Sequence, residues 1–404
     1  ERQVLVLVTL GLLAFGLVMV FSATSASAAL DGGNPIEPLA KQAVYAAGGV
    51  LAMIVLSRID YHVLRPLTPL LLVGAFVACA AVIVIGPSIN GAHRWFVVGP
   101  LSLQPSEFAK LAVLLWLAAR LSRRHAPRTP GELVKPIGLV VGAFGLVIIL
   151  QPDLGTTISL GLMAAAVLLV SGTPLRLMTL VGVASVSLAA VAIYLEPYRR
   201  ARMLAFLDPW QDAEDGGYQI VQAFIAIGRG GITGEGLGQS VQKANFLPEA
   251  HTDMIFAVVG EELGLVGVTL ILLAFAAFAW AGCRVARTCR DPFGMRVAAG
   301  ATALICGQAA VNIAAVLGIA PLTGIPLPFI SAGGSSLLVL LATVGIVLNI
   351  ASNERVVEAR VRGRSRGHSR PRAAGARSGG GAARPRRDRD VRRHPGSRRV
   401  AAGA

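Results

Sequence analysis

Charged residues are scarce in this chain, and the motifs of the common hydrolases and nucleotide-driven enzymes are missing. Asp, Glu, Lys and Arg make up 15% of the 404 residues, whereas soluble globular proteins carry about 25%. The sequence has no Ser-His-Asp signature, no His-Glu-x-x-His pattern and no Walker phosphate loop. These absences argue against a soluble protein, a membrane protease and an ATP-driven pump.

Cysteine is also rare, and its spacing does not suggest a metal site. Cys79 and Cys306 lie inside apolar runs, while Cys283 and Cys289 flank a basic loop without a paired His at zinc spacing. We therefore predict four free thiols, with neither a disulfide framework nor a zinc site.

Long apolar runs are abundant. The sequence is 54% hydrophobic, with a mean hydropathy of +0.66, and its apolar runs of about 15–20 residues are long enough to cross a bilayer. We predict an all-α polytopic membrane protein with about ten transmembrane helices, the first of which is a true span. The predicted spans are 4–21, 42–56, 67–85, 108–121, 136–150, 156–170, 175–195, 253–280, 298–317 and 329–350.

The basic residues of the short loops indicate the orientation of these spans. They fall on one side of the predicted bundle, together with the C-terminal tail, and by the positive-inside rule that side is the cytoplasm. These residues are Arg58, Arg65, Arg120, Arg123, Arg124, Arg128, Lys135, Arg284, Arg287, Arg290 and Arg296. The large loop 196–252, between the seventh and eighth spans, is then extracytoplasmic. Its three arginines do not overturn this, because long loops obey the rule weakly.

The C-terminal tail, residues 353–404, differs in composition from the transmembrane domain 1–352. From Glu354 to Ala404 it holds 16 Arg and 4 acidic residues among Gly, Ala, Pro and Ser. Such a segment cannot bury enough apolar surface to fold, so we predict a disordered cytoplasmic tail. Anionic membrane lipid is the expected partner of its arginines, in preference to nucleic acid.

Four ionisable residues crowd the entrance to the eighth span. Lys243, Glu249, His251 and Asp253 occur within eleven positions. A polar cap on a helix needs only one such residue, whereas charge at membrane depth usually marks a functional site. In the span itself, residues 257, 260, 264 and 267 would share one helix face that is nearly bare of side chains. That face would serve either helix packing or a groove for a lipid chain.

Two further segments place polar groups at the predicted outer face. The first contains Arg94, Trp95, Glu107 and Lys110. Glu107 and Lys110 are three residues apart, so they form either an intrahelical ion pair or a pair that holds an anionic head group. The second, 321–336, contains three Pro, three Gly and Ser331, which forbid a regular helix. Irregular backbone at membrane depth is tolerated in buried protein or around a wet cavity, where amides and hydroxyls can bind phosphate or sugar.

Together these segments resemble the SEDS family (shape, elongation, division and sporulation), and specifically its cell-division, or FtsW, branch, over almost all of residues 1–352. The motifs that carry the resemblance are Gly91-Ala-His-Arg-Trp95, Gln104-Pro-Ser-Glu-Phe-Ala-Lys110, Gln151-Pro-Asp153, Asp208-Pro-Trp210, Gly236-Leu-Gly-Gln-Ser240, Leu247-Pro-Glu-Ala-His-Thr-Asp253, Gly260-Glu-Glu-Leu-Gly264 and Pro326-Leu-Pro-Phe-Ile-Ser-Ala-Gly-Gly-Ser-Ser336. The chain departs from the family pattern at Arg229, where relatives often have Ser, and at Met254, where Phe is common.

The resemblance implies a peptidoglycan glycosyltransferase that polymerises lipid II at the outer face of the bacterial cytoplasmic membrane, at the division septum. It implies a class B penicillin-binding protein (an FtsI-like transpeptidase) and other divisome membrane proteins as partners, and no nucleic acid. The alternatives are a lipid II flippase, a rod-elongation polymerase of the same family and a scaffold without activity.

The resemblance also assigns roles to the candidate site residues. Asp253 matches the family's essential acid and would be the general base for the acceptor hydroxyl. A diphosphate leaving group needs charge stabilisation, which cationic side chains or a divalent cation such as Mg or Mn can supply. The residues expected to bind substrate are Arg94, Trp95, Glu107, Lys110, Lys243, Glu249, His251 and Ser331.

Overall fold

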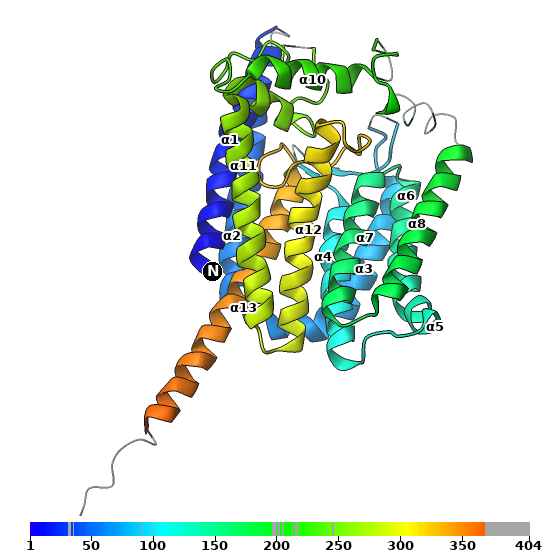
Figure 1. Ribbon diagram of the computed structural model, residues 1–404, viewed down its shortest axis with the longest axis vertical. Helices are drawn as coiled ribbons and strands as arrows, with labels where there is room; N and C mark the ends of the chain where they lie inside the picture. Colours follow the sequence, from blue (N-terminus) through cyan, green and yellow to red (C-terminus); the bar gives the residue numbers. More distant parts are fainter. Residues whose placement is uncertain are drawn as a thin grey trace, which may run out of the picture. The chain divides into compact units, whose positions relative to one another are not determined.

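Helices make up almost all of the regular structure in the computed structural model (Figure 1). The structure describes residues 1–30, 34, 36–89, 91–99, 101–195, 200, 203, 206–211, 213–214, 217–244 and 246–367. The helices are α1 (Arg2–Leu30), α2 (Ile36–Arg58), the 3₁₀ turn η1 (Tyr61–Val63), α3 (Leu64–Ile85), α4 (Pro105–Arg123), α5 (Pro130–Leu133), the π turn η2 (Val134–Gly138), α6 (Leu139–Leu150), α7 (Leu154–Val170), α8 (Leu175–Leu195), α10 (Tyr218–Gly230), α11 (Ile255–Thr288), α12 (Pro292–Val316) and α13 (Gly334–Gly367).

The all-α polytopic class predicted from the apolar runs is confirmed. Each of the ten predicted spans overlaps a helix of the structure. Among the described residues, seven helical segments are long and apolar enough to cross a membrane, and Leu154–Val170 and Leu175–Ser187 are shorter apolar helices. The number of ten passages, and the placement of the large loop outside, stay predictions.

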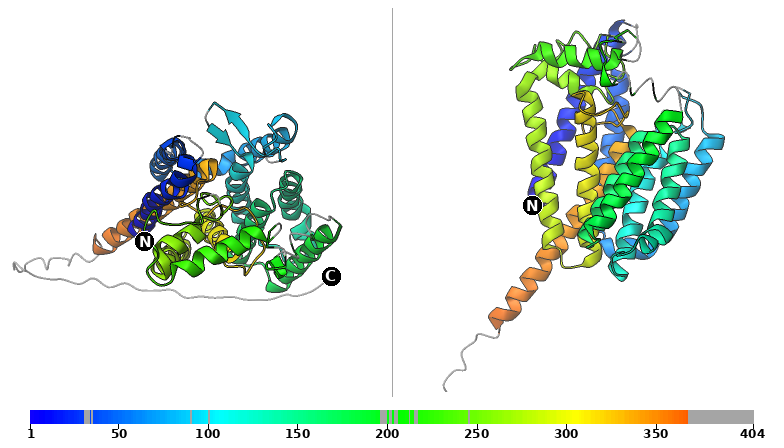
Figure 2. Two further views of the ribbon diagram at one scale, coloured as in Figure 1. Left: turned by 90° about the horizontal axis from the view of Figure 1, so that it is seen from above. Right: turned by 45° about the vertical axis from the view of Figure 1, so that its right-hand side comes forward.

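Helix α12 joins the two halves of the bundle. It packs against α11 on one side and against α7 and α4 on the other, while α1 packs against both α2 and α11. Figures 1 and 2 show the same arrangement, with α1, α2 and α11 on one side of α12 and α3, α4, α6, α7 and α8 on the other. The membrane-spanning segment Gly334–Asn353 of α13 is 89% buried. A polar residue on the inner faces of α12 therefore contacts both halves of the bundle.

The two ends of the bundle carry different elements. Helix α10 lies across the end at which α11 begins, whereas α5 lies at the opposite end (Figure 1). Helix α10 is amphipathic and packs its buried face, which includes Ile220, Val221 and Ala226, against α11. The segment that precedes Asp253 is thus fastened to the bundle.

Short polar residues set where several helices begin. Asp153 caps α7 by accepting a hydrogen bond from the backbone N–H of Thr156 at 2.9 Å. Asp291 caps α12 in the same way, with Gly294 as the donor at 2.8 Å and Pro292 at the first helical position.

A short β-hairpin adds to the all-α prediction. Strands β1 (Phe96–Val98) and β2 (Leu101–Leu103) pair antiparallel, with Phe96 opposite Leu103. The hydroxyl of Tyr45 in α2 donates a hydrogen bond to the carbonyl of Ser102 at 2.8 Å. The hairpin thereby joins α2 to the start of α4.

The prediction of one continuous glycine-rich face along the eighth span is wrong. Gly264 has φ +62° and ψ −156°, so α11 is kinked there and residues before and after it do not follow one helical register. A side chain at Gly264 would collide with the backbone of Gly234 and Ile232, and one at Gly230 would collide with Gly260. These glycines allow close backbone packing of the loop and α10 on α11, which supports the packing interpretation over a lipid groove.

The last helix differs from the prediction at both ends. It begins at Gly334, not at residue 329, because Pro326, Pro328 and the left-handed Phe329 (φ +66°) keep the preceding segment irregular. It continues to Gly367, so residues 353–367 are helical where a disordered tail was predicted. The chain divides into two compact units, Glu1–Glu358 and Ala359–Ala404. Residues 368–404, with most of the tail's arginines, lie outside the described residues.

Candidate active site

Asp253 lies two residues before α11, beside a narrow pocket. The N-cap of α11 is Met254, so Asp253 does not take the capping position that was its structural alternative. The backbone carbonyl of Asp253 accepts a hydrogen bond from Nδ2 of Asn312 at 2.7 Å, and its Oδ1 lies 3.3 Å from the hydroxyl of Thr252. The residues that line the pocket are Asp253, Met254, Asn312, Ala315, Val316, Leu322, Thr323, Gly324 and Ile325. Asp253 supplies the only carboxylate of this lining.

The turn that precedes Asp253 is tight. Glu249 has φ +53°, a left-handed conformation that is costly outside glycine. It is exposed, and its Oε2 accepts a hydrogen bond from the hydroxyl of Thr252 at 2.8 Å. His251 is partly buried, and this burial lowers the pKa of its imidazole, although the nearby Glu249 carboxylate acts in the opposite sense. At neutral pH His251 is therefore an uncharged member of the turn.

The irregular segment 321–333 packs directly against that turn. The backbone N–H of Ala332 donates to the carbonyl of His251 at 2.9 Å. The hydroxyl of Ser331 accepts from the N–H of Leu327 at 2.7 Å, and its carbonyl accepts from Nε2 of Gln42 at 3.1 Å. Ser331 is 2% exposed. The structure thus places Ser331 inside the segment, where its hydroxyl shapes the backbone; its predicted contact with substrate stays a prediction.

Glu107 and Lys110 form a buried ion pair in the first turns of α4. Nζ of Lys110 lies 2.8 Å from Oε1 of Glu107 and donates to Oε1 of Gln308 at 3.2 Å. Both charged residues are almost completely buried. The predicted pairing is confirmed, and Gln308 in α12 is a third member. We call the set Glu107, Lys110, Gln308, Asn312 and Asp253 the Asp253 cluster.

Arg94 connects the predicted outer loops to one another. Its Nε donates to the carbonyl of Gln151 at 2.7 Å, and its Nη2 donates to the carbonyl of Pro152 at 2.5 Å. Trp95 beside it is half-buried. Gln104 reaches the same region, because its Nε2 donates to Oδ2 of Asp153 at 2.8 Å and its N–H donates to the hydroxyl of Ser335 at 3.2 Å. Motifs from 91–110, 151–153 and 326–336 therefore meet.

Lys243 lies in a second cluster at the junction of the loop, α1 and α11. Its Nζ is 2.7 Å from Oε1 of Glu262 and 3.0 Å from the hydroxyl of Ser22. Glu261, beside it, accepts hydrogen bonds from the hydroxyl of Ser240 and from the N–H of Val241. Lys243, Glu261 and Glu262 are buried. This arrangement locks the loop to α11, and the predicted role of Lys243 in substrate binding stays a prediction.

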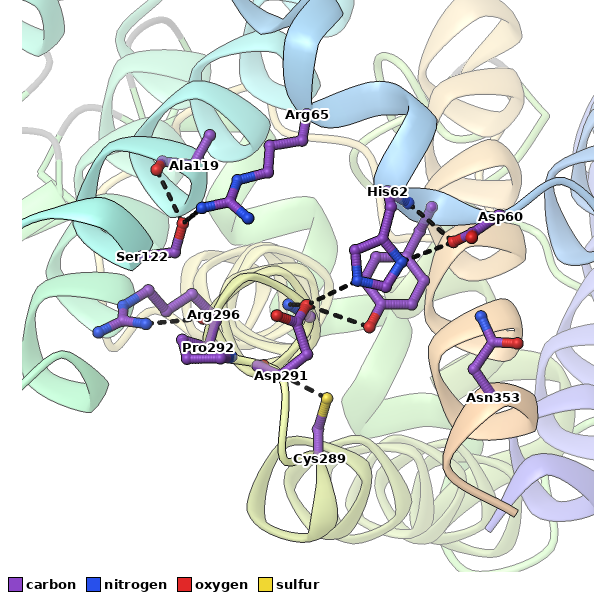
Figure 3. Close-up of polar contacts among 12 residues, drawn as sticks. Asp60, His62, Arg65, Ala119, Ser122, Cys289, Asp291, Pro292, Arg296 and Asn353 are labelled. Atoms are coloured by element: carbon purple, nitrogen blue, oxygen red, sulfur yellow. Dashed lines mark hydrogen bonds and ion pairs between the residues drawn. The ribbon is translucent and has the colours of Figure 1, made fainter. Parts of the chain in front are cut away.

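The opposite end of α11 carries a different polar group, shown in Figure 3. Asp291 caps α12, and its Oδ2 also accepts a hydrogen bond from the hydroxyl of Tyr61 at 3.1 Å and lies 3.5 Å from Nε2 of His62. The N–H of Tyr61 donates to Oδ1 of Asn349 at 3.1 Å. Hydrogen bonds from the backbone N–H and the imidazole of His62 lower the pKa of Asp60. We call Asp291, Tyr61, His62 and Asn349 the Asp291 cluster.

Two residues of the Asp253 cluster were missed by sequence reasoning. Gln308 and Asn312 lie one turn apart in the ninth predicted span, with apolar residues between them. Their spacing of four residues in a hydrophobic run was the available signal, because buried amides in membrane helices bond to other helices.

A metal ion would find few protein ligands here. Within the described part of the chain, no three His, Cys, Asp or Glu side chains are grouped to hold a metal ion. A divalent cation at Asp253 would share this single carboxylate with oxygen ligands from a bound phosphate, as Mg²⁺ does in many phosphate sites.

Comparison with known proteins shows which family the chain matches. The family model of cell cycle proteins that covers FtsW, RodA and SpoVE matches residues 2–356. Stage V sporulation protein E of Bacillus subtilis (strain 168) is 40% identical over 356 residues, which cover 87% of this chain and 97% of that protein. The "probable peptidoglycan glycosyltransferase FtsW" of Geobacter sulfurreducens (strain DL-1 / KN400) is 39% identical over 354 residues, 86% of this chain and 94% of that protein.

Solved structures share the fold. One, described as "Structural coordination of polymerization and crosslinking by a peptidoglycan synthase complex", has a TM-score of 0.73 and 32% identity, and the match covers 87% of this chain and 97% of that one. The crystal structure of the rod shape determining protein RodA of Thermus thermophilus has a TM-score of 0.65 and 28% identity, with 87% and 96% covered.

The apolar helices and the named relatives show a multi-pass bacterial membrane protein. The chain belongs to the family of FtsW, RodA and SpoVE, the SEDS family that its motifs resemble.

Proposed function

We propose that the chain is a peptidoglycan glycosyltransferase that polymerises lipid II into glycan strands at the outer face of the cytoplasmic membrane, with inversion at the anomeric carbon. We propose further that it acts in septal wall synthesis, because relatives named FtsW are about 39% identical to it. The single observation that carries the proposal is the position of Asp253. It lines a pocket together with the irregular segment 322–325, and its carbonyl is bonded to Asn312 of α12.

The proposed reaction needs one base and one group that stabilises negative charge. The hydroxyl of the acceptor sugar attacks the anomeric carbon of the lipid-linked donor, and the Asp253 carboxylate takes the hydroxyl proton. The bond from the anomeric carbon to the diphosphate oxygen breaks, and the diphosphate leaves with the bonding electrons. The leaving group needs a cation more than a proton, so a second carboxylic acid of the glycosidase kind is not required.

The proposed diphosphate ligands differ in their exposure and in the partners that they already have. Arg94 is partly exposed and lies beside the start of α7, where its guanidinium is oriented by the carbonyls of Gln151 and Pro152. Lys110 is 1% exposed and already paired with Glu107. A bound diphosphate would contact Lys110 only after a local rearrangement that exposes its Nζ. Trp95, Glu249 and His251 are proposed to shape the substrate site around them.

The proposed partners follow from the family. A solved relative belongs to a complex in which polymerisation and crosslinking are coordinated. We propose a class B penicillin-binding protein of the FtsI kind as the crosslinking partner, together with other division membrane proteins, and anionic lipid as the partner of the C-terminal arginines.

Purified full-length protein with lipid II tests the proposal directly. Glycan polymer, separated by gel electrophoresis after labelling, is the expected product. A control reaction contains lipid II without protein, and a second assay follows the movement of labelled lipid II across vesicle membranes. Movement of lipid II without polymer would support the flippase and contradict the proposal, since a flippase makes no glycosidic bond.

A further inference from the structure

Two buried amides on α12 hold the parts of the candidate active site together. Gln308 and Asn312 are 0% and 2% exposed and lie one helical turn apart. Helix α12 packs against both α11 and α4. Helix α12 thus contacts both α11, which follows Asp253, and α4, which carries the ion pair.

Asn312 clamps two irregular backbone segments at once. Its Nδ2 donates to the carbonyl of Asp253 at 2.7 Å and to the carbonyl of Ile325 at 2.7 Å. Both partners are carbonyl oxygens, which only accept, so the NH₂ group must face them and the orientation of the amide is determined. Neither partner residue is inside a helix. Both segments therefore depend on a side chain for this restraint.

Gln308 makes the corresponding link to the ion pair. Its Nε2 donates to the carbonyl of Pro326 at 3.1 Å, and its Oε1 accepts from Nζ of Lys110 at 3.2 Å. Ile325 and Pro326 are adjacent. The two amides hence connect Lys110, the irregular segment and Asp253 through consecutive peptide units.

We propose that Asn312 is a positioning residue for Asp253, and that Gln308 and Asn312 fix the distance between this base and the Glu107–Lys110 pair. The inference rests on the proposed function of Asp253. Proton abstraction requires the base within hydrogen-bond reach of the acceptor hydroxyl, and a misplacement of about 1 Å costs about 100-fold in rate. Without the Asn312 amide, the Asp253 carbonyl loses this hydrogen bond, and we expect the carboxylate to sample unproductive positions.

The test compares Asn312→Asp with Asn349→Asp in the full-length protein. Asp has the shape of Asn but cannot donate to the two carbonyls. Asn349 is the matched control, because it is also buried and also bridges backbone groups, with Nδ2 donating to the carbonyl of Ser57 at 2.9 Å. It belongs to the Asp291 cluster, at the other end of α11. Asn312→Ala is a second variant that introduces no carboxylate, in case Asn312→Asp does not fold.

Turnover with saturating lipid II, the dissociation constant for lipid II and the pH–rate profile are measured. We expect turnover to fall about 10- to 100-fold in the Asn312 variants, with the dissociation constant changed less than twofold. The added carboxylate of Asn312→Asp should move the acid limb of the pH–rate profile to higher pH, because a neighbouring negative charge raises the pKa of a carboxyl group. Asn349→Asp should leave turnover per folded molecule and the pH profile unchanged.

The outcomes separate failure of this inference from failure of the proposed function. Normal turnover in both Asn312 variants, or equal losses in the Asn349 control, would overturn the positioning role. If Asp253→Asn is inactive in the same assay, Asp253 remains the proposed base even when the positioning role of Asn312 is overturned. If Asp253→Asn polymerises lipid II normally, the base assignment itself is wrong.

Discussion

Asp253 and Asp291 stand just before α11 and α12, at opposite ends of the bundle, and they are used differently. Asp291 is a helix cap, and it also binds the hydroxyl of Tyr61. Met254, and not Asp253, is the N-cap of α11, and Asp253 lines a pocket. One acid thus completes a helix end, while the other lines a narrow pocket.

The neighbours of the two acids differ in the same way. In the Asp253 cluster and its pocket lining, three buried oxygen atoms have no hydrogen-bond partner among the described residues; they are Oε2 of Glu107, Oδ1 of Asn312 and Oγ1 of Thr323. In the Asp291 cluster both polar atoms of Asn349 are bonded. Nε of Arg65, also unpartnered, lies near this end, where its guanidinium sits over the ring of Phe293.

This difference shows where stability and function are separated. Buried polar atoms without partners cost free energy, so folded proteins retain few of them. The described residues hold ten such atoms, three of them in the Asp253 cluster or its pocket lining, and we propose that a bound ligand completes the hydrogen bonds of these three. Sites that break the local rules of folding are where function is expected.

The buried pair Glu107–Lys110 should give the largest effect on stability. Lys110→Ala leaves a buried carboxylate without its partner, which costs about 3–5 kcal/mol. The double variant Glu107→Gln/Lys110→Met removes both charges and should fold with nearly normal stability. We expect it to polymerise lipid II at least about 10-fold more slowly, since the cation that aids the leaving group is absent.

The exposed pair Lys41–Glu37 is the control for this variant. Its atoms are 2.7 Å apart, but the side chains are 48% and 62% exposed. Lys41→Ala should cost less than about 1 kcal/mol. A double variant of the buried pair with normal polymerisation would return Glu107 and Lys110 to a purely structural role.

His251 should make stability depend on pH at the Asp253 end. Burial lowers its pKa in the folded protein, so the unfolded chain takes up the proton first as pH falls through about 6.5. Stability is therefore full above this pH and is lost below it, by at most about 1.4 kcal/mol per pH unit. His251→Gln should remove this loss of stability, so the melting temperature of the variant should fall less than that of the wild type between pH 7.5 and 5.5.

His62→Gln, at the Asp291 end, provides the comparison for that experiment. The His62 side chain is 46% exposed and lies between Asp60 and Asp291. This variant should leave the acid-side loss of stability in place. An identical pH dependence in the wild type and in His251→Gln would show that burial of His251 does not affect folding.

Removal of the tail should have the smallest effect. A chain that ends at Asn353 keeps the buried part of α13 and loses arginines on the predicted cytoplasmic side, away from Asp253. We expect unchanged polymerisation in detergent and, in cells, altered localisation, because each Arg near anionic lipid contributes about 1 kcal/mol. A well-folded truncated protein without activity in detergent would make the tail part of the enzyme.

Sequence reasoning predicted most of the helices and several members of the site. Long apolar runs predict spans because lipid forces the backbone to satisfy its own hydrogen bonds. The cap at Asp153 and the pair Glu107–Lys110 depend on residues three apart, so local sequence was sufficient for them.

What was missed depends on contacts between distant segments. The kink at Gly264 arises where residues 232–234 pack against α11. Gln308 and Asn312 contact residues up to 198 positions away, which no local pattern specifies. The hairpin at residues 96–103 was not predicted because its strands are short, although its β-branched residues and Gly99 were a usable signal.

We infer that Asp253 acts chemically while Asp291 acts structurally. Purified Asp253→Asn and Asp291→Ala proteins, compared with the wild type for polymerisation of lipid II and for melting temperature, test it most directly. Asp253→Asn should fold normally and lose about 10²–10⁴-fold in rate, because an amide cannot accept the proton. Asp291→Ala should lose about 0.5–2 kcal/mol of stability with its helix cap, and keep its rate per folded molecule. Near-normal polymerisation by Asp253→Asn would contradict the claim.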